Sequence, residues 1–187
     1  VLQAISLRQL GRNKQANAVF SAALQLAPEN LSLRRLAAMA LIDDGGATEG
    51  LALFDEAPAE QRDTTAFKGN MVDLLTRAKR FDDALALASQ LSDAMPETMY
   101  RAGISDLYWQ AGNHDQALKT LRENIDAPQT ALQWLDRTLR AGEADGNSIF
   151  ATLDEQSYPP QVWALMGIRA ERAEDFEAEV AAMLPGV

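Results

Sequence analysis

Apolar residues recur three or four positions apart along almost the whole chain, and no stretch alternates apolar and polar positions with a period of two. A spacing of three and four places side chains on one face of an α-helix, whereas strict alternation is typical of a half-buried strand. Ala, Leu, Glu, Gln and Arg are frequent, and these residues favour helices. The pattern therefore predicts an all-α protein.

Helix-breaking residues divide this pattern into segments of about 10 to 15 residues, which makes roughly twelve short helices. Helices of this length are marginal on their own, so each must bury its apolar stripe against neighbouring helices. The breakers are Gly11, Pro28, Gly45, Gly46, Pro58, Pro96, Gly112, Pro128, Gly142, Gly146, Pro159 and Pro160.

The breakers are regularly spaced. The predicted turns at Gly11, Gly45, Lys79 and Gly112 are separated by 34, 34 and 33 residues. The same intervals separate a set of small residues and a set of larger apolar sites, namely Ala16, Gly50, Ala84 and Ala117, and Phe20, Phe54, Ala88 and Leu121. Small residues let two helices approach closely and larger ones fill the groove between successive pairs.

A 34-residue unit of helix, turn, second helix and closing proline resembles the tetratricopeptide repeat family. The segment "GRNKQANAVFSAALQLAPEN" carries the turn glycine, the small and bulky sites and Pro28, and "AKRFDDALALASQLSDAMPE" adds the aromatic Phe81 after its turn. "AGNHDQALKTLRENIDAP" keeps the pattern, and "WALMG" at 163–167 with Phe176 resembles a further opening. The resemblance covers nearly the whole chain.

The resemblance implies an α-solenoid of antiparallel helix pairs, one array over residues 1–187. Its second repeat has Gly50 at the small site and no closing proline at Arg62, and its fifth repeat is irregular. A shortened first helix and the absence of a polar closing helix after "AAMLPGV" predict a slice of a longer array. The expected repeats are approximately 1–30, 31–64, 65–97, 98–128, 129–158 and 159–187.

Charge narrows the class of partner. Lys and Arg total 17 against 27 Asp and Glu, a net charge of −10, which disfavours nucleic acid and anionic membrane surfaces and weakly favours a basic partner. No apolar run approaches the roughly 20 residues of a membrane span. The chain has no cysteine, so disulfides, thiolate metal sites and cysteine nucleophiles are excluded. The compartment stays open between bacterial periplasm and cytoplasm.

Candidate chemistry is sparse. His114 is the only histidine and stands where the resemblance places the aromatic of Phe81, so we expect a packing or turn role. A zinc site needs three or four ligands, and no catalytic constellation surrounds this histidine in the sequence. "DDGGATEG" at 43–50 lacks the pattern of a phosphate or calcium loop, and Asp82 with Asp83 suits a helix start. We expect no catalytic residue, cofactor or metal.

The resemblance implies that the first helix of each pair lines a concave surface that binds extended peptides or helices. Trp134 and Trp163 are expected in the core. If Tyr108 is the inward core residue, its neighbour Trp109 points toward the groove. The alternative is that the groove positions are only a solvated face. The predicted partner-binding residues are Arg35, Met39, Asn70, Asp73, Arg77, Asp106, Trp109 and Gln110.

One family subtype is disfavoured. Chaperone-binding members hold a terminal carboxylate with Lys, Asn and Arg side chains on three successive first helices. Arg35 and Asn70 match this clamp in kind, but Met39, Met99 and Gly103 occupy its other sites. A clamp without most of its donors cannot hold two carboxylate oxygens tightly.

The leading hypothesis is a non-catalytic interaction scaffold that docks a protein or peptide in its concave groove, in a bacterial assembly, secretion or exopolysaccharide-export complex. A second hypothesis is the regulatory or substrate-recruiting part of a larger enzyme. A third is a structural spacer that forms homo-oligomers through uncapped ends.

Overall fold

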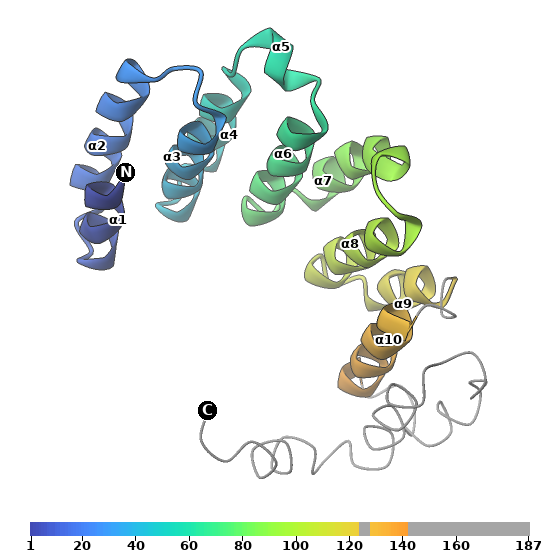
Figure 1. The fold of residues 1–187 in the computed structure, drawn as a ribbon. Helices are drawn as coiled ribbons and strands as arrows, with labels where there is room; N and C mark the ends of the chain where they lie inside the picture. Colours follow the sequence, from blue (N-terminus) through green and yellow to red (C-terminus); the bar gives the residue numbers. More distant parts are fainter. Residues whose placement is uncertain (124–127, 142–187) are drawn as a thin grey trace. The chain divides into compact units, whose positions relative to one another are not determined.

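Helices are the only regular elements in residues 1–123 and 128–141, the part of the chain that the computed structural model describes (Figure 1). This confirms the predicted all-α class. The chain divides into two units, Val1–Pro96 and Glu97–Val187. Within the described ranges, no helix is long and apolar enough to cross a membrane.

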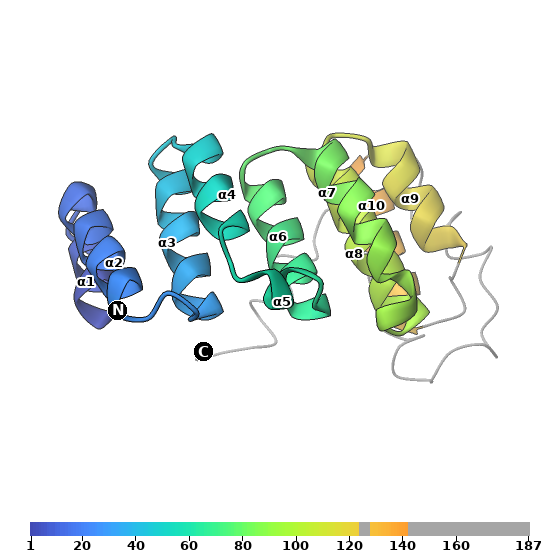
Figure 2. The same ribbon diagram turned by 90° about the horizontal axis from the view of Figure 1, so that it is seen from above.

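The first unit is a series of helix pairs joined by tight turns. Figures 1 and 2 both show α1 beside α2, α3 beside α4, and α6 beside α7. A short α5 stands between the second and third pairs, and α7 continues into the 3₁₀ helix η1. The elements are α1 (Leu2–Gln9), α2 (Asn13–Leu26), α3 (Leu31–Asp43), α4 (Ala47–Asp55), α5 (Ala59–Arg62), α6 (Thr65–Arg77), α7 (Phe81–Ala88) and η1 (Ser89–Ala94).

The second unit contains α8 (Glu97–Gln110), α9 (His114–Arg122) and α10 (Pro128–Ala141) in its described part. Asn113 caps α9 by accepting a hydrogen bond from the backbone N–H of Gln116 at 3.3 Å. Trp134 on α10 is buried, which confirms its expected place in the core. The rest of the fifth predicted repeat and all of the sixth, with Trp163 and Phe176, lie outside the described residues.

The four predicted turns share one backbone geometry. Gly11, Gly45, Lys79 and Gly112 have positive φ angles of 71°, 92°, 59° and 80°. In each turn, the N–H of this residue and the N–H after it donate to carbonyls three and five residues earlier, such as Lys79 N to Thr76 O at 2.9 Å and Arg80 N to Leu75 O at 2.8 Å. A left-handed residue with these bonds is a common helix ending and satisfies otherwise unpaired carbonyls.

Lys79 is the one non-glycine residue with positive φ in the described ranges, so its turn is strained. The left-handed conformation costs an L-residue roughly 1–2 kcal/mol, while glycine loses about 0.5–1 kcal/mol more entropy on folding. We expect Lys79→Gly to raise the free energy of unfolding by about 0.5–1 kcal/mol, measured by urea unfolding.

Two control variants isolate the backbone effect. Lys79→Ala removes the charge but keeps Cβ and should bring no gain. Gly45→Ala should lose about 1 kcal/mol through its φ angle alone, because an added Cβ there meets nothing within 4 Å. Equal stability of the glycine and alanine variants at position 79 would contradict a strained turn.

The recurring small and bulky sites form the interior of the pairs. All eight positions are buried, and Ala16, Ala84, Ala117, Phe54 and Leu121 have no exposed surface. In the first unit the core runs from α1 through α2 to α3, where Ala4, Phe20, Leu24, Leu33 and Ala37 pack together. The periodic sites of the sequence are therefore packing sites.

Two close contacts join successive elements of the first unit. A Cβ on Gly50 of α4 would lie 2.6 Å from the carbonyl oxygen of Ala38 on α3. The backbone of α3 therefore occupies the space that a side chain at position 50 would need. Phe54 of α4 stacks on Phe67 of α6, with ring centroids 4.6 Å apart and planes 12° apart. The first contact closes a helix pair and the second joins it to the next pair.

Candidate functional site

The predicted partner-binding residues of the first unit form two stripes on neighbouring first helices. Arg35 and Met39 lie four residues apart on α3, and Asp43 continues this stripe at the helix end. Asp73 and Arg77 lie four residues apart on α6. Residues four apart share one helix face, so the two stripes run along their helices.

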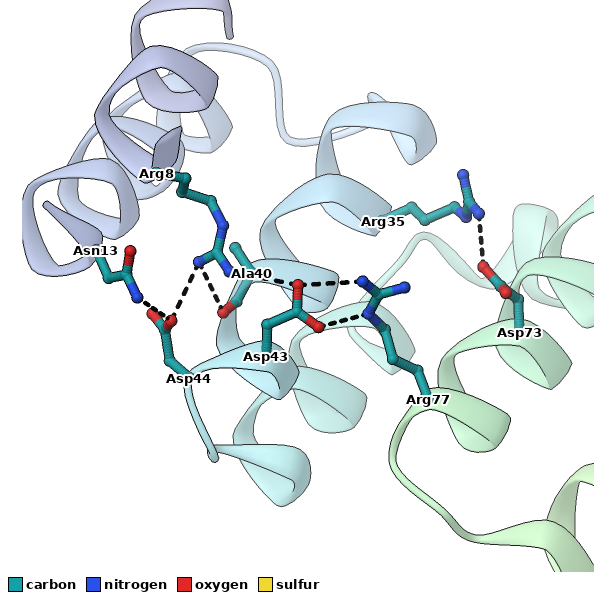
Figure 3. A network of polar contacts seen from close by, with 8 residues as sticks. All are labelled: Arg8, Asn13, Arg35, Ala40, Asp43, Asp44, Asp73 and Arg77. Carbon is teal, nitrogen blue, oxygen red and sulfur yellow. Dashed lines mark hydrogen bonds and ion pairs between the residues drawn. The ribbon is translucent and has the colours of Figure 1, made fainter. Parts of the chain in front are cut away.

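Ion pairs cross-link the two stripes (Figure 3). Arg35 donates from Nη2 to Asp73 Oδ2 at 2.5 Å. Arg77 donates to both carboxylate oxygens of Asp43, from Nε at 2.5 Å and from Nη2 at 3.2 Å. We call these residues, Arg35 with Asp73 and Asp43 with Arg77, the two rungs.

Asp43 also connects the rungs to α1. Arg8 donates to Asp43 Oδ2 at 3.3 Å, to Asp44 Oδ1 at 3.2 Å and to the carbonyl of Ala40 at 3.1 Å. Asn13 donates to Asp44 Oδ1 at 2.7 Å (Figure 3). A carboxylate at a helix C-terminus is disfavoured by the helix dipole, and the two arginines offset this cost at the end of α3.

The rungs link the exposed faces of α3 and α6, but they contribute little to the free energy of unfolding. Their side chains are between about a third and a half exposed, and such pairs are typically worth about 0.2–1 kcal/mol. The hydrogen bond that Arg77 donates to Asp43 raises the pKa of Arg77, as do the charges of Asp43 and Asp73, while burial lowers it. Arg77 therefore stays charged at any working pH, and each rung cancels one positive charge with one negative charge.

Met39 and Asn70 are the uncharged members of the predicted set in this unit, and both are half-buried. Met39 lies one helical turn from Arg35 and one from Asp43, so its position along α3 falls between those of the two rungs. Asn70 lies one turn before Asp73 on α6. The first-helix face thus combines one apolar side chain with paired charges.

In the second unit, Asp106 and Trp109 make internal contacts. Asp106 accepts a hydrogen bond from Gln133 at 3.0 Å and pairs with Arg137 of α10. The Arg137 guanidinium also bonds Ser105 and lies over the indole of Trp109, 5.4 Å from the ring centroid. Trp109 is half-buried and Gln110 is exposed.

His114 takes the packing role expected from its position. Its ring stacks on Trp109 with centroids 4.2 Å apart and planes 21° apart. It begins α9 as Phe81 begins α7, so the histidine replaces an aromatic at an equivalent place. Among the residues that the structure describes, no group of three or more His, Cys, Asp or Glu could hold a metal ion.

Sequence reasoning did not single out Asp43, Asp44, Arg8 or Arg137 as part of this surface. The signal for the first was available: Asp43 and Arg77 stand 34 residues apart, one repeat period, and carry opposite charges. Both end a first helix, as Gln110 does in α8. Opposite charges one period apart thus indicate an ion pair between successive repeats.

Comparison with known proteins agrees with this repeat geometry. Residues 7–69 match the tetratricopeptide repeat family model. A solved structure of a tetratricopeptide repeat protein from Parabacteroides merdae is similar in fold, with a TM-score of 0.52 at 15% identity, over 87% of this chain and 68% of that one. No curated protein matches. Residues 7–69 therefore match a tetratricopeptide repeat, a type of repeat that generally mediates protein–protein interaction, and the described helix pairs show an all-α helical repeat fold similar to that of a tetratricopeptide repeat protein.

Proposed function

We propose that this chain is a non-catalytic scaffold that docks a protein or peptide partner on the first-helix faces of its units. In the first unit this face comprises Arg35, Met39, Asn70, Asp73 and Arg77. The observation that carries the proposal is the position of Met39 between the two rungs. It places a flexible apolar side chain within a frame of charges that are already paired.

Such a frame suits protein recognition for two physical reasons. Interfaces bury a central apolar contact inside a polar rim that excludes water, and methionine adapts to varied partner surfaces. The rungs also fix their long side chains before binding, so the partner orders fewer of them on docking. Because each rung is neutral, this face selects shape, while the net charge of −10 steers basic partners toward the chain.

The second unit contributes Asp106, Trp109 and Gln110 as its own contact face. His114 and Arg137 both contact the indole of Trp109 and limit its motion, while the ring stays partly exposed. Tryptophan is among the residues that dominate binding energy at interfaces. A rigid, half-exposed indole is therefore suited to contact a partner.

The test begins with capture of partners by the intact chain, followed by affinity measurement with the purified partner. We expect Met39→Glu to weaken binding at least tenfold, because it places an unpaired charge at the centre of the contact. Gln15→Glu on α2 adds the same charge at an exposed position outside this face and should leave the affinity within about twofold of the original value.

A charge swap examines the rungs without removing them. Arg35→Asp combined with Asp73→Arg can restore the ion pair in reverse and should preserve the fold by circular dichroism. We expect weaker binding, because the partner meets each charge on the opposite helix. If both the charge swap and Met39→Glu bind the partner with full affinity, this face is not the partner-binding surface.

We extend this proposal to a bacterial assembly, secretion or exopolysaccharide-export complex. The support is that the alanine-rich and leucine-rich repeats resemble those of bacterial assembly and export proteins. The domain would there recruit partners while the reaction takes place on another protein. Identification of the captured partner decides this setting directly.

A further inference from the structure

A cleft of about 550 Å³ lies in the first unit, on a different side of α3 from the rungs. On α3 the cleft is lined by Arg34, Ala37 and Leu41, whereas the stripe that carries the rung residues consists of Arg35, Met39 and Asp43. At about 100° per residue, these two sets lie on roughly opposite faces of the helix. The other lining residues are Asn17, Ala18, Phe20, Ser21, Leu24 and Gln25 of α2, with Leu53 and Glu56 at the end of α4.

The cleft has an apolar floor, and its volume falls in the range of small-ligand and peptide side-chain pockets. Phe20, Leu24 and Ala37 belong to the core cluster, and Leu53 packs against it. These residues are already held by core packing, so the cleft is formed before any ligand arrives. A large aliphatic side chain entering it would exchange water for apolar contacts.

Two polar atoms of the lining residues have no hydrogen-bond partner. Arg34 is 7% exposed and donates to the carbonyls of Leu53 at 2.9 Å and Pro28 at 2.8 Å, but its Nε is unpaired. Asn17 Oδ1 is also unpaired, and its orientation is fixed because Nδ2 donates to the carboxylate of Asp44 at 2.9 Å. An unpaired buried polar group is costly, which favours a ligand that supplies the missing partner.

The charges of the lining cancel. Arg34 and Glu56 are the ionisable residues among them, and their charges lie 3.8 Å apart. An additional carboxylate would meet Glu56, and an additional ammonium group would meet Arg34. A peptide group complements the cleft better, since its carbonyl can accept from a donor and its N–H can donate to an acceptor without adding charge.

We propose that this cleft is a second binding site, which takes an uncharged peptide segment carrying one leucine-like side chain. The side chain occupies the apolar floor, and the carbonyl of an adjoining peptide group accepts from Arg34 Nε after a small adjustment of this side chain. The proposal is independent of partner docking on the first-helix faces. Either site can fail while the other stands.

The experiment titrates the full isotope-labelled chain with N-acetyl-leucine N-methylamide and follows its NMR spectrum. We expect saturable shifts confined to the cleft residues, with a Kd on the order of 1 mM for a probe of this size. N-acetyl-glycine N-methylamide lacks the side chain, and N-acetyl-leucine adds a carboxylate. Each should bind at least fivefold more weakly.

Two tryptophan variants provide the matched control. Ser21→Trp fills the cleft from α2 and should abolish the shifts, whereas Ala22→Trp puts the same ring on an adjacent exposed position outside the cleft and should preserve them. Arg34→Met keeps the apolar floor but removes the donor to the probe carbonyl and leaves the charge of Glu56 uncompensated, so it should weaken binding of the neutral probe and disfavour the carboxylate analogue further. The unliganded spectrum of each variant verifies its fold.

Four outcomes would overturn the proposal. The first is no shift up to 20-fold above the expected Kd, and the second is equal shifts with the glycine probe. The third is unchanged binding by Ser21→Trp. The fourth is a shift of the same resonances on dilution without probe, which would assign the cleft to a second copy of the chain. Retention of the probe shifts with loss of Met39-dependent partner binding would separate this site from the first-helix faces.

Discussion

Replacement of Phe54 by alanine is expected to lower the free energy of unfolding by about 3–5 kcal/mol. Phe54 has no exposed surface, and its ring stacks on Phe67 across the boundary between the second and third pairs. The loss combines the transfer of a large apolar side chain, a cavity between α4 and α6, and a stacked pair worth about 0.5–1.5 kcal/mol. Urea unfolding followed by circular dichroism measures it.

The control is Leu26→Ala, which removes an aliphatic side chain that is 88% exposed and should change stability by less than about 0.5 kcal/mol. Repeat proteins can unfold in parts, so hydrogen exchange of the α4 and α6 amides gives a local readout. These amides should lose protection in Phe54→Ala. A loss of stability below about 1 kcal/mol would show that the stack is not a main contact between the pairs.

Substitution of Gly50 by alanine is expected to destabilise the protein by about 1–3 kcal/mol, although alanine is the better helix former by about 1 kcal/mol. The added Cβ would lie 2.6 Å from Ala38 O and 2.7 Å from Ile42 Cγ1. The nearer atom belongs to the backbone of α3, so the two helices must separate to relieve the contact. Helix propensity and packing therefore predict opposite signs, and the packing cost outweighs the gain in helix propensity.

Gly69 provides the matched comparison within the same unit. It lies inside α6, where an added Cβ would meet nothing within 4 Å. Gly69→Ala should therefore gain about 0.5–1 kcal/mol from propensity alone. Both variants are measured by urea unfolding under the same conditions. A gain in both would show that α3 and α4 can adjust their separation freely.

The sequence predicts the turns and the small sites because each depends on local chemistry repeated at a fixed interval. Glycine at three of the four turns suits a left-handed residue. The repeat spacing predicts a turn at Lys79 as well, and the structure shows the same left-handed conformation there, with a φ of 59°. Gly50 departs from the alanine of the other repeats, and the close approach of Ala38 O explains this departure.

The side-chain contacts of the candidate faces could not be predicted in the same way. Whether Arg35 meets Asp73 or solvent depends on how far successive first helices are shifted along one another, and residue spacing within one helix does not set this shift. Arg34 shows the same limit. From sequence alone, an arginine would be expected at an exposed position. Arg34 is buried because two carbonyls from other segments accept its hydrogen bonds.

The pairing of Asp43 with Arg77 across one repeat period restricts how this array can grow or rearrange. If residues 65–97 were duplicated in tandem, the Asp43–Arg77 pair would remain, but the new boundary would set Arg77 beside the equivalent arginine of its copy. A tandem copy of residues 31–64 would likewise set two aspartates together. Although the repeats share one backbone plan, the charges at their ends are complementary only in the present order. Exchange or duplication of a single repeat would lose this complementarity at one boundary, at a cost of about one exposed ion pair.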